Sequence, residues 1–283
     1  MKNALSHTEI LGEGVVALLD VMGNDEVILD SARRSYSSNK TKVFTEAENR
    51  SLMRYLMRHR HTSVYEMCEA RFFLRIPIFV ARQLVRHRTA NINELSGRYS
   101  ELPESYYIPD IEQLGPQSTD NKQGRGEVMD VTDVQIAKAQ QTIRLQGHEA
   151  FETYDSLLHV SGVSREIARI VLPLSSFTEM YWKCDLHNLF HFLRLRLHPH
   201  AQYEIRIMAE AMYAAIQPHF PLAVEAFEDY QLRSRTLSRG EQDVLACLLA
   251  GESLSEDLGV REGLSLREYR EFVEWYESLR SRA

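Results

Sequence analysis

Three stretches of the chain have a pattern of apolar and polar residues that predicts a β-strand. Gly14 to Asp20 reads GVVALLD, and Ser176 to Lys183 reads SFTEMYWK. From Glu66 onward, Cys68, Ala70, Phe72, Leu74 and Ile76 alternate with a second set of residues that includes Glu69, Arg71 and Arg75. Pro77 ends this strand, because proline has no backbone N–H to donate to a sheet.

Helical spacing and capping residues predict the helices. Thr45 and Glu48 form a capping box before a helix that runs to about His59. Asp185 is a plausible N-cap for the segment DLHNLFHFLRLRL, and Ser164 can cap a helix that carries Ile167 and Ile170 and ends before Pro173. Further helices are expected from Asn24–Asp25 to Arg34, from Pro77 to Val85, up to about His159, over 200–216 and over 221–230. Polar residues with glycines over 115–126 predict a surface loop or a disordered connection.

The last 50 or so residues have a pattern of their own. Ser238 with Glu241 and Ser265 with Glu268 form two more capping boxes. We therefore expect one domain over 1–232 and a helical C-terminal extension over 233–283, whose role the sequence does not indicate.

Composition narrows the class of protein. The 283 residues are 44% hydrophobic and 26% charged, as in ordinary globular proteins. The net charge of -7 argues against nucleic-acid binding as the main role. No stretch reaches the ~20 apolar residues of a membrane span, and the start MKNALSHTEI lacks an apolar signal core. Three separated cysteines suggest neither a disulfide framework nor a cysteine zinc site, so we expect a cytoplasmic protein.

The segment QLVRHRTANINELSGRY, from Gln83 to Tyr99, concentrates arginines in a polar turn. Several guanidinium groups beside Ser96–Gly97 are suited to a nucleotide phosphate, because arginine holds oxyanions through two parallel bonds and glycine lets backbone amides approach. A solvated charged surface, with Glu94 paired to an arginine, would use the same residues. Charge alone does not decide between the two interpretations.

The order of the residues does decide. Arg86-His87-Arg88, seven residues and then Ser96-Gly97-Arg98-Tyr99 resembles the signature of the flavin-dependent thymidylate synthases. The segments LLDVMGND, SARRSY (31–36), PIFVARQ, REIARIVLP (165–173) and PHAQYEI (199–205) are similar to the same family, so the resemblance covers roughly residues 14–230. It implies an α/β (α+β) fold with a mixed sheet and flanking helices, and a homotetramer whose active sites are shared between subunits. It also implies that dUMP is converted to dTMP, with 5,10-methylenetetrahydrofolate giving the carbon and FAD, reduced by NADPH, giving the hydride.

The resemblance also assigns residues. The positions that match dUMP contacts are Gln83, Arg86, Glu94, Leu95, Ser96, Gly97, Arg98, Arg169 and Arg196. Those that match FAD contacts are Ser63, Arg86, His87, Arg88, Glu94, Asp185, His187, His191 and Leu195, with His61 near flavin and folate. Arg196 corresponds to the catalytic residue, whose fixed positive charge would stabilise the developing negative charge on the uracil ring. Asp185 and His187 depart from the Asn-x-Arg that is common in the family.

Three alternative classes of protein would use some of the same residues. His187 and His191 lie one helical turn apart and could bind a metal, but Asn188 cannot be the general base that a HExxH hydrolase requires, so we expect no metal site. A cysteine-dependent thymidylate synthase would need an activated thiolate, and only Cys184 lies near the expected site, beside Lys183. A regulatory nucleotide-binding protein would keep the arginines and need no flavin.

Overall fold

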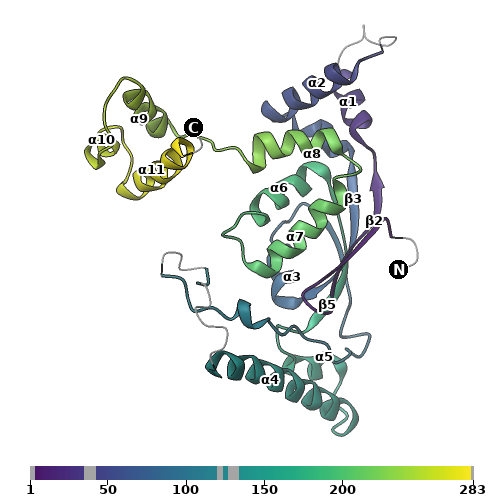
Figure 1. Cartoon of the computed structure of the whole chain (residues 1–283). Coiled ribbons are helices and arrows are strands. Elements are labelled where there is room, and N and C mark those ends of the chain that lie inside the picture. Colours follow the sequence, from purple (N-terminus) through teal and green to yellow (C-terminus); the bar gives the residue numbers. More distant parts are fainter. Residues whose placement is uncertain (1–3, 35–42, 120–123, 127–133, 282–283) are drawn as a thin grey trace. The chain divides into compact units, whose positions relative to one another are not determined.

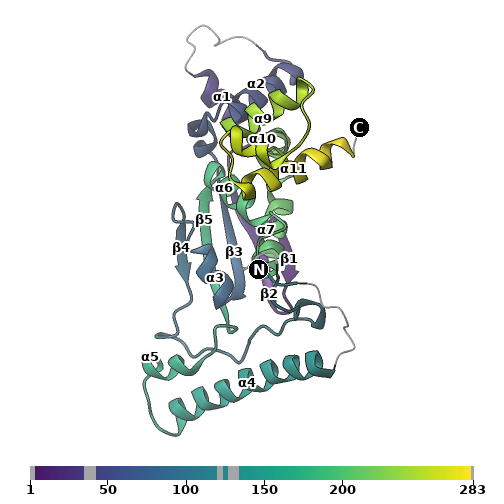
Figure 2. The ribbon, with the colours of Figure 1, turned by 90° about the vertical axis from the view of Figure 1, so that its left-hand side faces the viewer.

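A five-stranded sheet is the centre of the computed structural model, which describes residues 4–34, 43–119, 124–126 and 134–281. The strands are β1 (Ser6–Ile10), β2 (Gly14–Met22), β3 (Glu69–Pro77), β4 (Asn91–Glu94) and β5 (Phe177–Asp185), in the order β1-β2-β3-β5-β4 (Figures 1 and 2). Every strand pairing of this sheet is antiparallel. The α+β class is therefore confirmed. The expected mixed sheet is wrong, because neighbouring strands of this sheet run in opposite directions.

The three predicted strands are confirmed, and two more were missed. Along β3 the side chains of Ala70, Phe72, Leu74 and Ile76 are buried, as the alternation predicts. Strand β1 (SHTEI) and strand β4 (NINE) have too few apolar residues to show this pattern, and all four residues of β4 are exposed. Strand β4 is a strand because it pairs with β5, and its own residues have no pattern from which a strand could be predicted.

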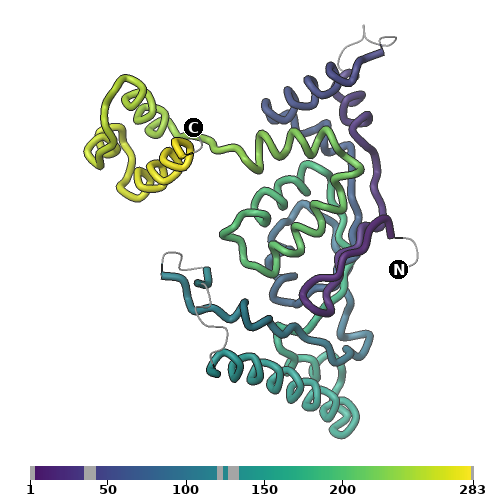
Figure 3. Tube along the Cα trace, in the orientation of Figure 1, coloured from purple at the N-terminus to yellow at the C-terminus, as the bar shows by residue number. Residues whose placement is uncertain are grey.

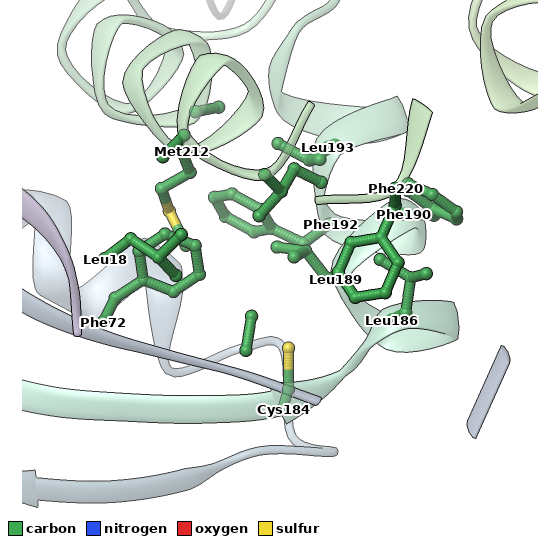
Figure 4. Packing of buried hydrophobic residues seen from close by; sticks show 14 of the residues in the cluster. Leu18, Phe72, Cys184, Leu186, Leu189, Phe190, Phe192, Leu193, Met212 and Phe220 are labelled. Atoms are coloured by element: carbon green, nitrogen blue, oxygen red, sulfur yellow. The ribbon is translucent and has the colours of Figure 1, made fainter. Parts of the chain in front are cut away.

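Helices cover one face of the sheet. Helix α6 (Leu186–Arg196) and helix α7 (Tyr203–Ile216) lie side by side, joined by a short turn (Figure 3). Figure 4 shows Leu189, Phe192 and Leu193 of α6 packed near Phe72 of the sheet and Met212 of α7. These contacts bury the apolar side chains away from water, and the hydrophobic effect is the main force that holds the helices to the sheet.

Further helices contribute side chains to the same core. They are α1 (Asp25–Arg33), α2 (Glu46–Arg58), the 3-10 helix η2 (Thr62–Met67), α3 (Ile78–Leu84) and α8 (Pro221–Phe227). Phe190 of α6 stacks on Phe227 of α8 with ring centroids 4.5 Å apart. The predicted cap at Asp185 and the capping box of Thr45 and Glu48 are both present, and Asn24 caps the helix that was expected to begin at Asn24–Asp25.

Some predicted boundaries shift. The helix after Ser164 is short, α5 (Arg165–Ala168), followed by a 3-10 turn η4 (Arg169–Val171). Ser164 makes no side-chain cap bond, and Ile167 and Ile170 are exposed. The helix predicted from residue 200 begins at Tyr203, since the turn over 198–202 precedes it. The helix predicted to Tyr230 ends at Phe227 and continues as a π-turn, η5 (Glu228–Leu232).

A second, smaller core forms around α4 (Val134–His159). Phe151 and Tyr154 of α4 are buried with Ala168 of α5, and Tyr106 stacks on Phe151. The short 3-10 helix η3 (Ile111–Gln113) precedes the predicted loop, in which Gln117 and Arg125 form an isolated antiparallel bridge. Residues 120–123 of that loop, and Ser35 and Tyr36 of the SARRSY segment, lie outside the described residues.

The chain divides into two compact units, Met1–Leu232 and Arg233–Ala283. The second contains α9 (Arg239–Leu249), α10 (Glu256–Arg261) and α11 (Leu266–Arg280), and both predicted capping boxes are present. Its core is formed by Val244, Leu258, Leu264, Tyr269 and Phe272. Among the helices of the described residues, none is long and apolar enough to cross a membrane.

Candidate active site

The end of α3 positions the Arg-His-Arg segment. The backbone N–H of Arg86 donates to the Gln83 carbonyl at 3.3 Å, and that of His87 donates to the Leu84 carbonyl at 2.9 Å. These bonds form a tight turn directly after the helix. Arg86 and Arg88 are exposed, whereas His87 is half-buried.

These residues line a pocket of about 370 Å³ together with α6 and β5. Its wall contains two groups of residues that were predicted to meet, Arg86, His87 and Arg88 from one segment and His191, Leu195 and Arg196 from the other. Thr89, Trp182 and Asn188 complete it. The structure thus brings the arginine-rich turn and the predicted catalytic residue into one cavity.

His87 and Arg196 are in direct contact inside the pocket. The Arg196 Nε–H donates to His87 Nε2 at 3.1 Å. Burial, together with the positive charge of Arg196 and the neighbouring His191, lowers the pKa of His87 to about 4. His87 is therefore neutral at physiological pH, with its Nε2 accepting from the guanidinium and its proton on Nδ1.

His87 is also held by aromatic contacts. Its ring meets that of Phe192 edge-to-face at 4.9 Å, and the ring of His191 lies 6.1 Å away. Burial, and then the charges of Arg194 and His187, lowers the pKa of His191 as well. Two neutral imidazoles can donate and accept hydrogen bonds beside the permanently charged Arg196.

A second group of predicted residues lies in the loop after β4. The Ser96 Oγ accepts the backbone N–H of Arg98 at 3.3 Å, and the Ser96 carbonyl accepts those of Tyr99 and Ser100. The Leu95 N–H donates to the Glu179 carbonyl of β5 at 2.8 Å, which fixes the start of this loop on the sheet.

Arg169 reaches the same loop from the turn after α5. A Cβ added at Gly97 would lie 3.2 Å from the Arg169 Cδ and 3.1 Å from the Leu102 Cδ1, so glycine leaves room for the arginine. Arg98 forms an ion pair with Glu166 of α5 at 3.1 Å. Two arginines that are far apart in sequence thus stand beside Ser96 and Gly97.

The charged-surface interpretation pairs Glu94 with an arginine, but no such pair occurs among the described residues. The Glu94 Oε1 accepts the Thr178 hydroxyl at 2.6 Å. Since Glu94 pairs with Met180 and Ile92 with Trp182, the β4–β5 strand pair connects this loop to the wall of the pocket.

Other predicted contacts have their own places. Gln83 donates through Nε2 to the Gln202 Oε1 at 2.5 Å. Both carboxylate oxygens of Asp185 accept from Asn188, at 2.9 Å from its backbone N–H and 2.8 Å from its side chain, so this residue caps α6. Ser63 is exposed at the start of η2, His61 precedes it, and His187 does not line the pocket. The roles assigned to all of these residues remain predictions.

The cysteines lie in surroundings that suppress ionisation. Burial raises the pKa of Cys184 well above its ordinary value, and the nearby Asp185 and Glu69 carboxylates add to this effect. Burial also raises the pKa of the Cys68 thiol to about 11. The Lys183 ammonium acts in the opposite direction and lowers the pKa of Cys184, but it is paired with both Glu69 oxygens, at 2.7 and 2.8 Å, and burial outweighs its effect.

Four contributors to the site were missed from the sequence, and Thr89 is one of them, although it directly follows the Arg-His-Arg segment. Trp182 looks like a core residue of a strand, and nothing in the sequence marks it as a pocket wall. Asn188 could have been found, since it shares a helical face with His191 and Leu195 at spacings of three and seven. Thr178 becomes visible only through its pairing with Glu94.

Within the described residues there is no group of three or more histidine, cysteine or acidic side chains arranged for a metal ion.

This chain is similar to known proteins over most of its length. The family model "Thymidylate synthase complementing protein" matches residues 17–222. The flavin-dependent thymidylate synthase of Ehrlichia ruminantium (strain Gardel) is 46% identical over 267 residues, covering 94% of this chain and 86% of its own. That of Dictyostelium discoideum is 45% identical over 245 residues, covering 82% and 77%.

A solved structure has the same architecture. The UMP/dUMP methylase PolB from Streptomyces cacaoi, bound with 5-Br dUMP, superposes with a TM-score of 0.69 at 36% identity. The superposition covers 77% of this chain and 96% of PolB. Because the family model matches residues 17–222 and the relatives are similar over most of the chain, the protein belongs to the flavin-dependent thymidylate synthase family and is a methyltransferase.

Proposed function

We propose that this protein methylates dUMP to dTMP, with 5,10-methylenetetrahydrofolate as carbon donor, FAD as hydride carrier and NADPH as the source of electrons. The observation that carries the proposal is the contact between neutral His87 and Arg196 inside a pocket lined by Arg86 and Arg88. It is supported by the relatives named flavin-dependent thymidylate synthase and by the PolB structures, which contain 5-Br dUMP and 5-Br UMP.

The nucleotide phosphate would bind at the loop after β4. Arg98, Arg169, Ser96 and the Gly97 backbone provide two guanidinium groups, a hydroxyl and an approachable amide, as a phosphate dianion requires. Glu94, Leu95 and Gln83 would contact the rest of the nucleotide, and Arg86 would serve nucleotide and flavin together.

Arg196 would act on the uracil ring. Carbon C5 becomes nucleophilic only when negative charge on the ring edge is stabilised, and a guanidinium does this without transferring a proton. The bond to His87 uses only the Nε–H, so the two terminal NH₂ groups can serve a ligand. Because His87 is neutral, it orients the guanidinium and adds no second positive charge that would repel it.

The residues of the pocket fit a flavin. Imidazole and amide side chains at His87, His191 and Asn188 match the mixed donors and acceptors on the edge of an isoalloxazine ring. Ser63, Arg88, Glu94, Asp185 and His187 would complete the FAD contacts. When bound, reduced flavin supplies the hydride, and the protein holds the nucleotide and flavin in place.

A cysteine mechanism is disfavoured by the surroundings of Cys184. A thiol whose pKa is raised by burial is a poor nucleophile. Cys68 is likewise buried, and Cys247 lies in the second unit.

We also propose a homotetramer with shared active sites, located in the cytoplasm. Large apolar side chains at Ile167, Ile170 and Leu174 are exposed next to Arg169, and β4 is exposed along its whole length. Burying such side chains against another subunit would be favourable. The net charge of -7 supports a protein without nucleic-acid partners. The synthase domain is assigned to 1–232, and no function is assigned to 233–283.

Flavin absorption tests the proposal directly. The purified protein should show the absorption bands of an oxidised flavin or acquire them with added FAD, and dUMP should alter these bands because both ligands share Arg86. A protein that binds dUMP and never binds flavin would be a nucleotide-binding regulator, and the proposed function would be wrong.

A further inference from the structure

Glu204, on the first turn of α7, is a buried carboxylate whose side chain is only 3% exposed. Its Oε1 accepts from the Arg125 guanidinium at 3.2 Å and from the Tyr107 hydroxyl at 3.3 Å. Its Oε2 accepts from the Gln202 Nε2 at 2.8 Å. Every bond to this carboxylate is therefore one that it accepts.

This carboxylate fixes the orientation of two amides in succession. An ionised carboxylate cannot donate, so Gln202 must turn its NH₂ toward Glu204 and its carbonyl oxygen toward Gln83. That oxygen can only accept, so Gln83 must offer its own NH₂, and the two atoms are 2.5 Å apart. The direction follows from the chemistry of the groups and needs no choice between the oxygen and nitrogen of either amide.

We propose that Glu204 is a positioning residue for the nucleotide site, acting through Gln202 to keep the Gln83 carbonyl oxygen turned toward the nucleotide. This inference rests on the proposed function, in which Gln83 contacts dUMP. A fixed carbonyl oxygen accepts from an N–H or O–H of the nucleotide, such as uracil N3–H or a ribose hydroxyl. The series of three residues is called the amide relay below.

Glu204 also has a structural contact, which the test must separate from the relay. Arg125 donates to the Gln113 carbonyl at 2.9 Å and to the Gln113 Oε1 at 2.8 Å, so its ion pair with Glu204 fastens the chain near 113 and 125 to α7. Arg125 and Tyr107 bind one oxygen of Glu204, and the relay uses the other. Substitutions can therefore address each side separately.

In Glu204→Gln, the new amide should keep its oxygen toward Arg125 and Tyr107, because two donors, one of them charged, face that side. Its NH₂ then faces Gln202, which must flip, and Gln83 must flip in turn. The KM for dUMP should rise about fivefold while kcat changes less than about twofold, since one oriented hydrogen bond is lost in binding.

In the double variant Gln202→Glu with Glu204→Gln, the hydrogen bond between positions 204 and 202 runs in the reverse direction. The bond that Gln83 donates to position 202 is restored. The amide at 204 donates to the carboxylate at 202, which accepts from the Gln83 NH₂ as in the wild type. Its KM for dUMP should return to within about twofold of the wild-type value. Tyr107→Phe is the matched control, since it removes a bond to the Oε1 of Glu204 and leaves the relay intact, so its KM should not change.

Gln202→Met tests the relay even if Glu204→Gln, at a buried position, fails to fold. Gln202 is exposed, and methionine keeps the length of the side chain without making its hydrogen bonds. Its KM should also rise about fivefold. An active wild type whose KM is unchanged in Gln202→Met, or a folded double variant no better than Glu204→Gln, would overturn the relay alone. A wild type that neither binds dUMP nor forms dTMP would overturn the proposed function, and the relay with it.

Discussion

Replacing Arg196 with alanine should nearly abolish turnover while leaving the fold and the flavin site in place. The guanidinium lies in the pocket, where its Nε–H donates a hydrogen bond to the Nε2 of the neutral His87 at 3.1 Å. Its loss removes the charge that would stabilise the activated uracil. Removing one such preorganised group from an active site costs about 3–4 kcal/mol at the transition state, so kcat should fall about 100- to 1,000-fold.

The stability of Arg196→Ala should change little. One hydrogen bond to a neutral imidazole contributes about 0.5–1.5 kcal/mol. Burial lowers the pKa of Arg196, which means that the protein disfavours its charged form, and removing the side chain relieves this cost. The two effects oppose each other, so Tm should move by no more than about 4 °C.

The assay measures dTMP formation at saturating dUMP, together with the flavin content of each preparation. Arg194→Ala is the matched control, because Arg194 is an exposed arginine on the same helix that does not line the pocket. Its kcat should stay within about twofold of the wild-type value. If Arg196→Ala turned over at a near-normal rate with flavin bound, the role given to this guanidinium would be wrong.

Four further outcomes are expected. Ser96→Ala should remain active with a KM for dUMP raised about fivefold, since a phosphate contact is lost; intact dUMP binding with no chemistry would contradict this. Because the pKa of His87 falls from 6.5 to about 4 on folding, the unfolded chain binds more protons between these values, and stability should decrease as the pH drops from 6.5 to about 4. Urea midpoints should show a smaller decrease in His87→Gln, and an equal one would refute the shift. Replacing all three cysteines with alanine should leave dTMP formation possible, whereas a cysteine adduct with dUMP trapped by mass spectrometry would exclude the flavin mechanism. Phe272→Ala should destabilise the second unit by about 3–5 kcal/mol, visible in calorimetry as an earlier transition for that unit, and an unchanged trace would refute its core role.

Features set by neighbouring residues could be predicted from the sequence. The Asp185 cap and the Thr45–Glu48 capping box depend on residues three positions apart, and both are present. The alternation along β3 marks which side chains face the helices, and those are the buried ones. Short-range geometry fixes such elements, so local patterns suffice to find them.

Features that depend on distant segments could not be predicted in this way. Strand β4 exists because β5 pairs with it, and its own residues have no strand pattern. The antiparallel direction of the sheet likewise depends on where each connection returns. Ile167 and Ile170, which the sequence assigns to one helix, instead lie in a four-residue helix and a following 3-10 turn, and both are exposed.

The candidate site shows the same division. The resemblance indicated which residues belong together, but not that Arg196 donates to His87 across 109 positions or that Gly97 makes room for Arg169. The role of Gln202 and Glu204 within the PHAQYEI segment also requires three dimensions, because the relay passes from α7 to α3.

An anaerobic assay of dTMP formation tests the central claim most directly. The purified protein, stripped of flavin, is supplied with dUMP, 5,10-methylenetetrahydrofolate and NADPH, with and without FAD. The account predicts dTMP only when FAD is present. Equal dTMP formation without flavin, or none in either case from folded protein that binds both dUMP and FAD, would contradict it.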